Sequence, residues 1–322
     1  MCPLTRTCQY WPVNFYLGKR LGNKGMLRLS AFFVRSLSNS KRLSLRTLLA
    51  CAVALVVGAC ACSWASPVLS DEACDQRHFE MLYTVTKVGS AGSGTVIWSG
   101  PEPGAEDQGV RTLVLTNHHV VAGAIQVAEE WDPQAGEQRE IERREPLSIA
   151  WYDYNDCSRA VGERVKRSTI LGYDQQRDLA VLELEDHEQG VEFVAALLPE
   201  GSHPRLMDQV WAIGAGLGQP PFATSGEIAH QRAVIQGYPY LLTTAPIIWG
   251  NSGGALFVVH EGSHVLVGVP SRVTAVFRTP VTHMAWSIPV VTVREFLREN
   301  ELGFVLGDEP KEEDDEDDED EG

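Results

Sequence analysis

The sequence predicts an all-β protein, because short runs of strand-forming residues alternate with turn-rich polar stretches. The stretch 99–109, for example, holds two Pro and three Gly between two such runs. One helix is predicted at 291–300, where Val291, Phe296 and Leu297 recur at helical spacing. Strand length and turn spacing fit either a sandwich or a barrel. The predicted strands lie at residues 95–98, 111–115, 147–154, 165–173, 179–184, 209–213, 223–229, 256–259, 264–269 and 285–288.

The composition is that of a globular protein with room for two domains. The chain has 322 residues, 44% of them hydrophobic and 22% charged, with a net charge of −16. An acidic folded region repels phosphates, so the charge argues against a nucleic-acid partner. The last stretch, 308–322, is almost wholly acidic and is predicted to stay disordered.

The amino-terminal region has the pattern of an export signal. A basic flank precedes an apolar run at 48–65, with cleavage expected after Ala61 or Ala65. The same run is long enough for an uncleaved membrane tether, and Cys60 lies in a poor lipidation motif, so anchor and lipoprotein remain alternatives. Met26 is a candidate start. We expect an exported protein, periplasmic or extracellular.

Loss of residues 1–65 would leave two cysteines, Cys74 and Cys157. In an oxidising compartment they either pair or remain free thiols, and both interpretations stay open. No cofactor is expected. His260 and His264 flank a turn rather than sharing a helix face, so no metal site is predicted either.

Three ordered segments indicate acyl-transfer chemistry. Ser252 lies within the glycine-rich segment 250–254, which suits a turn that exposes a hydroxyl beside backbone N–H groups. A histidine pair lies upstream in the segment 116–120, and an aspartate lies in 177–181. The order is therefore His, Asp, Ser, whereas α/β-hydrolases order their triad Ser, Asp, His. An esterase of that fold is thus disfavoured.

The segments resemble the trypsin-like serine peptidases, most closely the HtrA (Deg) branch. Similar motifs lie at 92–95 and 287–289, and the resemblance covers roughly residues 78 to 300. It implies two six-stranded antiparallel β-barrels of chymotrypsin type with a carboxy-terminal helix. The implied domains are the basic and signal region 1–65, a first barrel in 66–198, a second barrel in 199–307, and the tail 308–322.

The resemblance also assigns roles. Ser252 is the expected nucleophile, His119 the base rather than its neighbour His118, and Asp178 the acid rather than Asp174. The backbone N–H groups of Gly250 and Ser252 are the expected oxyanion hole. The residues expected to line the substrate pocket are Pro246, Ile247, Val269, Pro270, Ser271 and Ala285.

Two departures from relatives affect the expected function. Asn251 stands where digestive trypsin-like enzymes carry an Asp that pairs with a new amino terminus, so no zymogen cleavage is expected. Only about twenty residues follow the predicted helix, too few for the PDZ domain of many HtrA proteins. We expect a serine endopeptidase acting on polypeptides, with uncharged aliphatic P1 residues, because no expected pocket residue is acidic. The alternative is a catalytically inert binding protein on a protease scaffold. No oligomeric state follows from the sequence.

Overall fold

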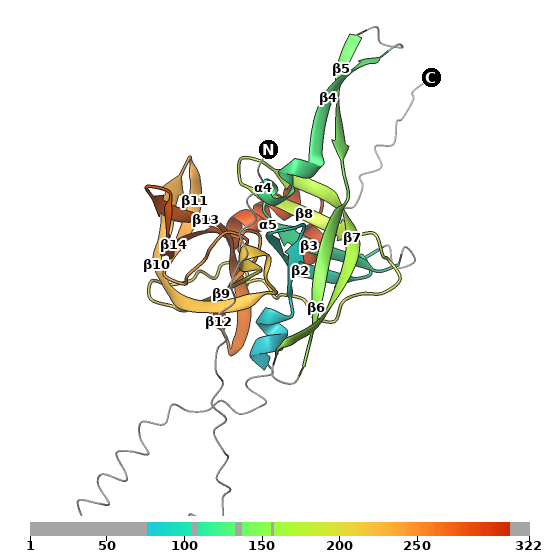
Figure 1. Cartoon of the computed structure of the whole chain (residues 1–322). Helices are drawn as coiled ribbons and strands as arrows, with labels where there is room; N and C mark the ends of the chain where they lie inside the picture. The colour runs from blue at the N-terminus through green and yellow to red at the C-terminus, as the bar shows by residue number, and fades with distance from the viewer. Residues whose placement is uncertain (1–75, 105–108, 133–136, 156–157, 310–322) are drawn as a thin grey trace, which may run out of the picture. The chain divides into compact units, whose positions relative to one another are not determined.

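The computed structural model describes residues 76–104, 109–132, 137–155 and 158–309 (Figure 1). The predicted export segment, Cys74, Cys157 and residues 310–322 lie outside this range, so the expectations about them stay predictions. In the described part of the chain, no helix combines the length and hydrophobicity needed to cross a membrane.

The first barrel is closed and antiparallel, with strand order β1-β2-β3-β8-β7-β6. A short π-helical turn, η1 (His78–Leu82), precedes it. Its strands are β1 (Val85–Val88), β2 (Gly92–Gly100), β3 (Arg111–Thr116), β6 (Leu147–Tyr154), β7 (Ala160–Asp174) and β8 (Leu179–Leu184).

The second barrel has the same closed construction, with order β10-β11-β14-β13-β12-β9. Residues 185–208 connect the two barrels. The all-β class and the pair of six-stranded barrels are therefore confirmed. The strands are β9 (Gln209–Gly214), β10 (Phe222–Ile235), β11 (Tyr238–Thr243), β12 (Ala255–His260), β13 (Ser263–Val276) and β14 (Thr279–Pro289).

Of the elements outside the barrels, the sequence predicted the carboxy-terminal helix but not the two-stranded hairpin. The helix α5 (Val290–Glu299) matches the predicted one within a residue, and Arg298 in its last turn donates to Asp308 at 2.8 Å. The hairpin β4 (Ile125–Asp132) and β5 (Glu137–Arg144) extends away from the first barrel in Figure 1 and was not predicted. Its strands carry charges on both faces, which hides the alternation that marks a half-buried strand.

Apolar runs in the strands are explained by burial on both faces. In β3, Leu113 and Leu115 pack in a cluster shared by the two barrels, whereas Val114 between them packs inside the first barrel. Alternate side chains of a strand point to opposite faces, so one run serves two cores. Phe296 and Leu297 of α5 join the shared cluster. Each such side chain contributes roughly 1.5–3 kcal/mol by burial, which holds the barrels in contact.

Candidate active site

His119 is oriented by Asp178 through two kinds of hydrogen bond. It lies on a single helical turn, α4 (His118–Val121), directly after β3. Its Nδ1 is 2.9 Å from both carboxylate oxygens of Asp178, and its backbone N–H donates to Oδ1 at 3.0 Å. A proton on Nδ1 leaves Nε2 as the acceptor, which is the tautomer a general base requires. The His119 side chain is 47% exposed, so Nε2 is not sealed in the core.

Asp178 is buried and held in a left-handed backbone conformation. Its φ is 57°, which short polar residues tolerate better than others, and Asn117 Nδ2 donates to its carbonyl at 2.8 Å. Ser271 Oγ donates to Oδ2 at 2.6 Å. Burial by itself raises the pKa of Asp178, but the hydrogen bonds from His119 and Ser271 outweigh it and hold that pKa below its ordinary value. The acid is therefore an anion at neutral pH.

The Ser252 hydroxyl is not bonded to His119 in this rotamer. Its Oγ donates instead to the carbonyl of Ser271 at 3.3 Å. Ser271 thus contacts both Asp178, through its hydroxyl, and Ser252, through its carbonyl.

The loop before Ser252 has a conformation that only glycine adopts without strain. Gly250 has a φ of 100°, and a Cβ there would lie 2.6 Å from the Ala215 carbonyl oxygen. The carbonyl of Trp249 accepts from Leu217 N–H at 2.7 Å. This bond turns the carbonyl before Gly250 toward the neighbouring loop.

The amides of this loop divide into two groups. The N–H groups of Asn251, Gly253 and Gly254 donate to backbone carbonyls at 3.0 Å. Those of Gly250 and Ser252 have no protein acceptor anywhere in the described ranges. Two unpaired amides flanking a nucleophile fit an oxyanion hole.

Ser93 fixes this loop from the first barrel, a role the sequence analysis missed. Its Oγ donates to the Gly250 carbonyl at 2.5 Å and accepts from Ala215 N–H at 2.7 Å. Its backbone N–H donates to the Ser252 carbonyl at 2.9 Å. The available signal was its place in the glycine-flanked motif 92–95 at the start of β2. The loop that carries Ser252 therefore depends on both barrels.

The competing residues of the triad have other partners. His118 stacks on Tyr173, with ring centroids 5.1 Å apart. Asp174 accepts from the side chain and the backbone N–H of Arg177. Both are therefore engaged outside the His119–Asp178 pair.

The six expected pocket residues differ in burial and contacts, and the pocket that they were expected to line stays a prediction. Pro246 is exposed, whereas Ile247 and Ala285 belong to the core of the second barrel. Val269 is fully buried in the cluster between the barrels. The Pro270 carbonyl accepts a hydrogen bond from Gly253 N–H, and the Ser271 hydroxyl donates one to Asp178. No group of three metal-ligating side chains was found within the described residues.

Comparison with known proteins identifies the family of this chain. A family model described as a trypsin-like peptidase domain matches residues 92–269. A solved structure of the HtrA-type protease AlgW with a tripeptide aligns with a TM-score of 0.50 and 20% identity, over 72% of this chain and 63% of that one. The serine endoprotease of Yersinia pestis aligns with a TM-score of 0.48 and 22% identity, over 76% and 69%.

These structural likenesses concern the fold, and the chain spans 63% of the length of the AlgW chain. A search of curated proteins gave no match. The family model, however, covers more than half of the chain and includes the segments that carry His119, Asp178 and Ser252. The chain belongs to the trypsin-like peptidase family.

Proposed function

We propose that the protein is a serine endopeptidase that hydrolyses polypeptides through an acyl-enzyme. The observation that carries this proposal is the His119–Asp178 pair, in which Nδ1 lies 2.9 Å from the carboxylate, together with the unpaired amides of Gly250 and Ser252. A serine hydroxyl needs a base and preset donors for the developing oxyanion. Both requirements have candidates in this site.

In the proposed mechanism, Ser252 Oγ attacks the scissile carbonyl carbon while its proton passes to His119 Nε2. The oxyanion is met by the N–H groups of Gly250 and Ser252, and one such donor is worth about 3 kcal/mol in the transition state. The imidazolium, stabilised by Asp178, then protonates the leaving amine. Water repeats the sequence on the acyl-enzyme, and the serine is regenerated.

We further propose that the site is ordered without zymogen cleavage. Asn251 is 1% exposed, and its Oδ1 accepts from Ile248 N–H at 3.0 Å within the same loop. Its Nδ2 has no partner in the described part of the chain. A neutral side chain thus supports the loop at the position where a carboxylate would need a buried cation.

Exchange of Asn251 for Asp is therefore expected to slow labelling by a fluorophosphonate probe about tenfold or more, because a buried, unpaired carboxylate distorts the loop. The unprocessed wild-type chain should label as fast as a fragment starting at Ser66. Asn300→Asp, a half-buried position away from the loop, is the control. If labelling began only after cleavage at one defined bond, the proposal would be wrong.

Substrate preference is proposed from the absence of acidic groups among the six expected pocket residues. A pocket without a carboxylate has nothing to pair with Arg or Lys, so uncharged P1 residues such as Val, Ala or Leu are expected.

Digestion of unfolded casein, with cleavage sites read by mass spectrometry, tests both activity and preference. Internal peptide-bond cleavage after aliphatic residues is the expected result. A profile dominated by P1 Arg or Lys contradicts the preference alone, whereas intact casein contradicts the peptidase proposal.

A further inference from the structure

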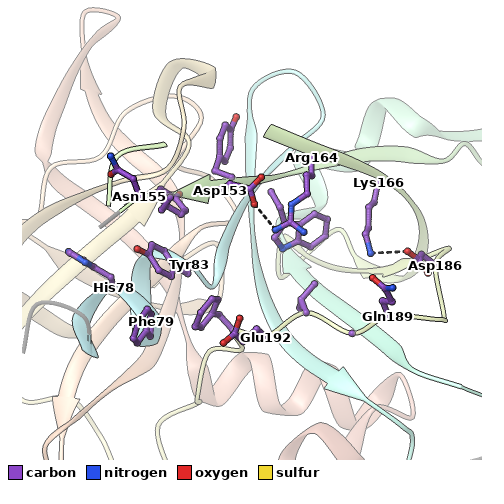
Figure 2. A pocket seen from close by; sticks show the side chains of 16 residues that line it. His78, Phe79, Tyr83, Asp153, Asn155, Arg164, Lys166, Asp186, Gln189 and Glu192 are labelled. Carbon is purple, nitrogen blue, oxygen red and sulfur yellow. Dashed lines mark hydrogen bonds and ion pairs between the residues drawn. The ribbon is translucent and has the colours of Figure 1, made fainter. Parts of the chain in front are cut away.

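A cavity of about 1530 Å³ opens at one end of the first barrel (Figure 2). It lies between η1, the strands β6 and β7, and the connecting residues 186–193. None of the residues of the candidate active site lines it. Typical small-molecule sites occupy ~300–1,000 Å³, so this cavity is larger than such a ligand requires.

Aromatic rings form one side of the cavity. Phe79 stacks on Phe193, with centroids 5.2 Å apart, and Tyr83 stacks on Tyr154 at 4.5 Å. Tyr83 also meets the edge of Phe193 at 5.2 Å, which joins the two pairs. Phe79 remains 43% exposed. An exposed aromatic stack at a cavity mouth is a ready contact for apolar side chains of a ligand.

Two polar atoms of cavity-lining side chains have no hydrogen-bond partner in the described structure. They are the indole Nε1 of Trp151 and the hydroxyl of Tyr154. Trp151 is only 8% exposed, and burial raises the pKa of Tyr154, which keeps its hydroxyl protonated. Buried donors normally have acceptors, so these two call for an explanation. Backbone carbonyls of a bound polypeptide are acceptors of the kind that these two donors lack.

The opposite side carries charges of both signs. Arg164 pairs with Asp153 and Lys166 with Asp186, each at 2.8 Å, as Figure 2 shows. The side chains of the first pair are 67% and 46% exposed, so this ion pair is weak and can exchange partners. Glu192 adds a further carboxylate. A rim of mixed sign complements a polypeptide carrying both charges and disfavours a polyanion such as a nucleic acid.

We propose that this cavity is an exosite for polypeptide substrates. It would hold an extended segment far in sequence from the scissile bond, with apolar side chains on the Phe79–Phe193 stack and main-chain carbonyls near Trp151 and Tyr154. The inference rests on the proposed peptidase function. It predicts that long, unfolded substrates bind more tightly than short peptides with the same cleavage site.

The test compares a long and a short substrate on the full chain. The probes are reduced, carboxymethylated lactalbumin and a chromogenic tetrapeptide. In the double variant Phe79→Ala/Phe193→Ala, KM for the protein substrate should rise about tenfold, because two aromatic contacts are lost, with kcat unchanged. The kcat/KM for the tetrapeptide should stay within about twofold of wild type.

A second variant tests the cavity without changing the aromatic residues. Gln189→Trp fills the cavity from its exposed rim and should raise the same KM. Val165→Ala is the matched control, since Val165 is 62% exposed and lies between the cavity residues Arg164 and Lys166 on the other face of β7. Unchanged KM in both cavity variants, or equal losses on both substrates, would overturn the exosite.

Binding without turnover separates this inference from the proposed activity. The Ser252→Ala chain should bind carboxymethylated lactalbumin, and adding the Phe79→Ala/Phe193→Ala changes should weaken binding about tenfold. That result supports the exosite even if the wild-type chain cleaves neither substrate. If the added changes abolish binding of the amphiphile anilinonaphthalene sulfonate but leave polypeptide binding intact, the cavity takes small amphiphiles and the proposal fails.

Discussion

Replacing Ser252 with alanine is expected to abolish fluorophosphonate labelling and to lower kcat on casein by about a million-fold. The change removes the hydroxyl of the proposed nucleophile, while the backbone N–H groups of residues 250 and 252 remain to stabilise an oxyanion. Stability should be nearly unaffected, because the hydroxyl makes one 3.3 Å hydrogen bond. Covalent labelling is read by intact mass, and unfolding by thermal denaturation.

Ser263→Ala is the matched control, because Ser263 is an exposed serine at the start of β13 in the same barrel. It should label at the wild-type rate. Persistent labelling of the Ser252→Ala chain at the wild-type rate would show that another residue is the nucleophile. Such a result would contradict the proposed mechanism but not the assignment of the fold.

Asp178→Asn is expected to lower kcat about ten-thousand-fold while the protein stays folded. An amide in this position no longer selects the Nδ1–H tautomer of His119, so Nε2 is lost as a base. Asparagine also tolerates the φ of 57°, so the backbone need not change. Steady-state kinetics measure the loss, with Asp174→Asn as the control at the acid that bonds Arg177. Equal losses in the two variants would contradict the assignment of Asp178.

The same substitution should change how stability depends on pH. The pKa of Asp178 is lower in the folded protein than in the unfolded chain, so the anion's contribution is fully present above the unfolded pKa of about 4. It is lost as the pH falls through the folded pKa. The free energy of unfolding should therefore fall less steeply below about pH 4 in Asp178→Asn than in wild type. Parallel curves from urea unfolding would contradict this linkage.

The strand-rich class and the triad candidates were predictable because their signals are local, whereas the two barrels followed from the family resemblance. A run such as 113–115 must be buried whatever its partners are, and a serine flanked by glycines marks a tight turn in any strand-rich chain. The order of His119, Asp178 and Ser252 along the chain also separates this fold from α/β-hydrolases, whose order is Ser, Asp, His. The choice of His119 over His118 came from its position in a motif. In the structure, the ring of His118 stacks on Tyr173.

The hairpin β4–β5 and the strand β1 were not predicted, for a different reason, and β11 (Tyr238–Thr243), which contains Pro239, was missed as well. The hairpin is a two-stranded ribbon whose residues carry charges on both faces, and β1 has only four residues. Neither shows the periodicity on which strand prediction depends. Such elements are stabilised by pairing with neighbours rather than by their own pattern.

The sequence by itself determined the strand-rich class, the glycine-rich turn at Ser252 and the residue types available for acyl transfer. Only the tertiary structure decided that Ser271 bonds Asp178, that Ser93 bonds the loop of Ser252, and that Val269 is buried in the cluster shared by the two barrels. The physical reason is distance along the chain. The Ser271–Asp178 bond joins residues 93 positions apart, and the Ser93–Gly250 bond joins residues 157 positions apart, so both depend on how the two barrels pack. No local pattern records that packing.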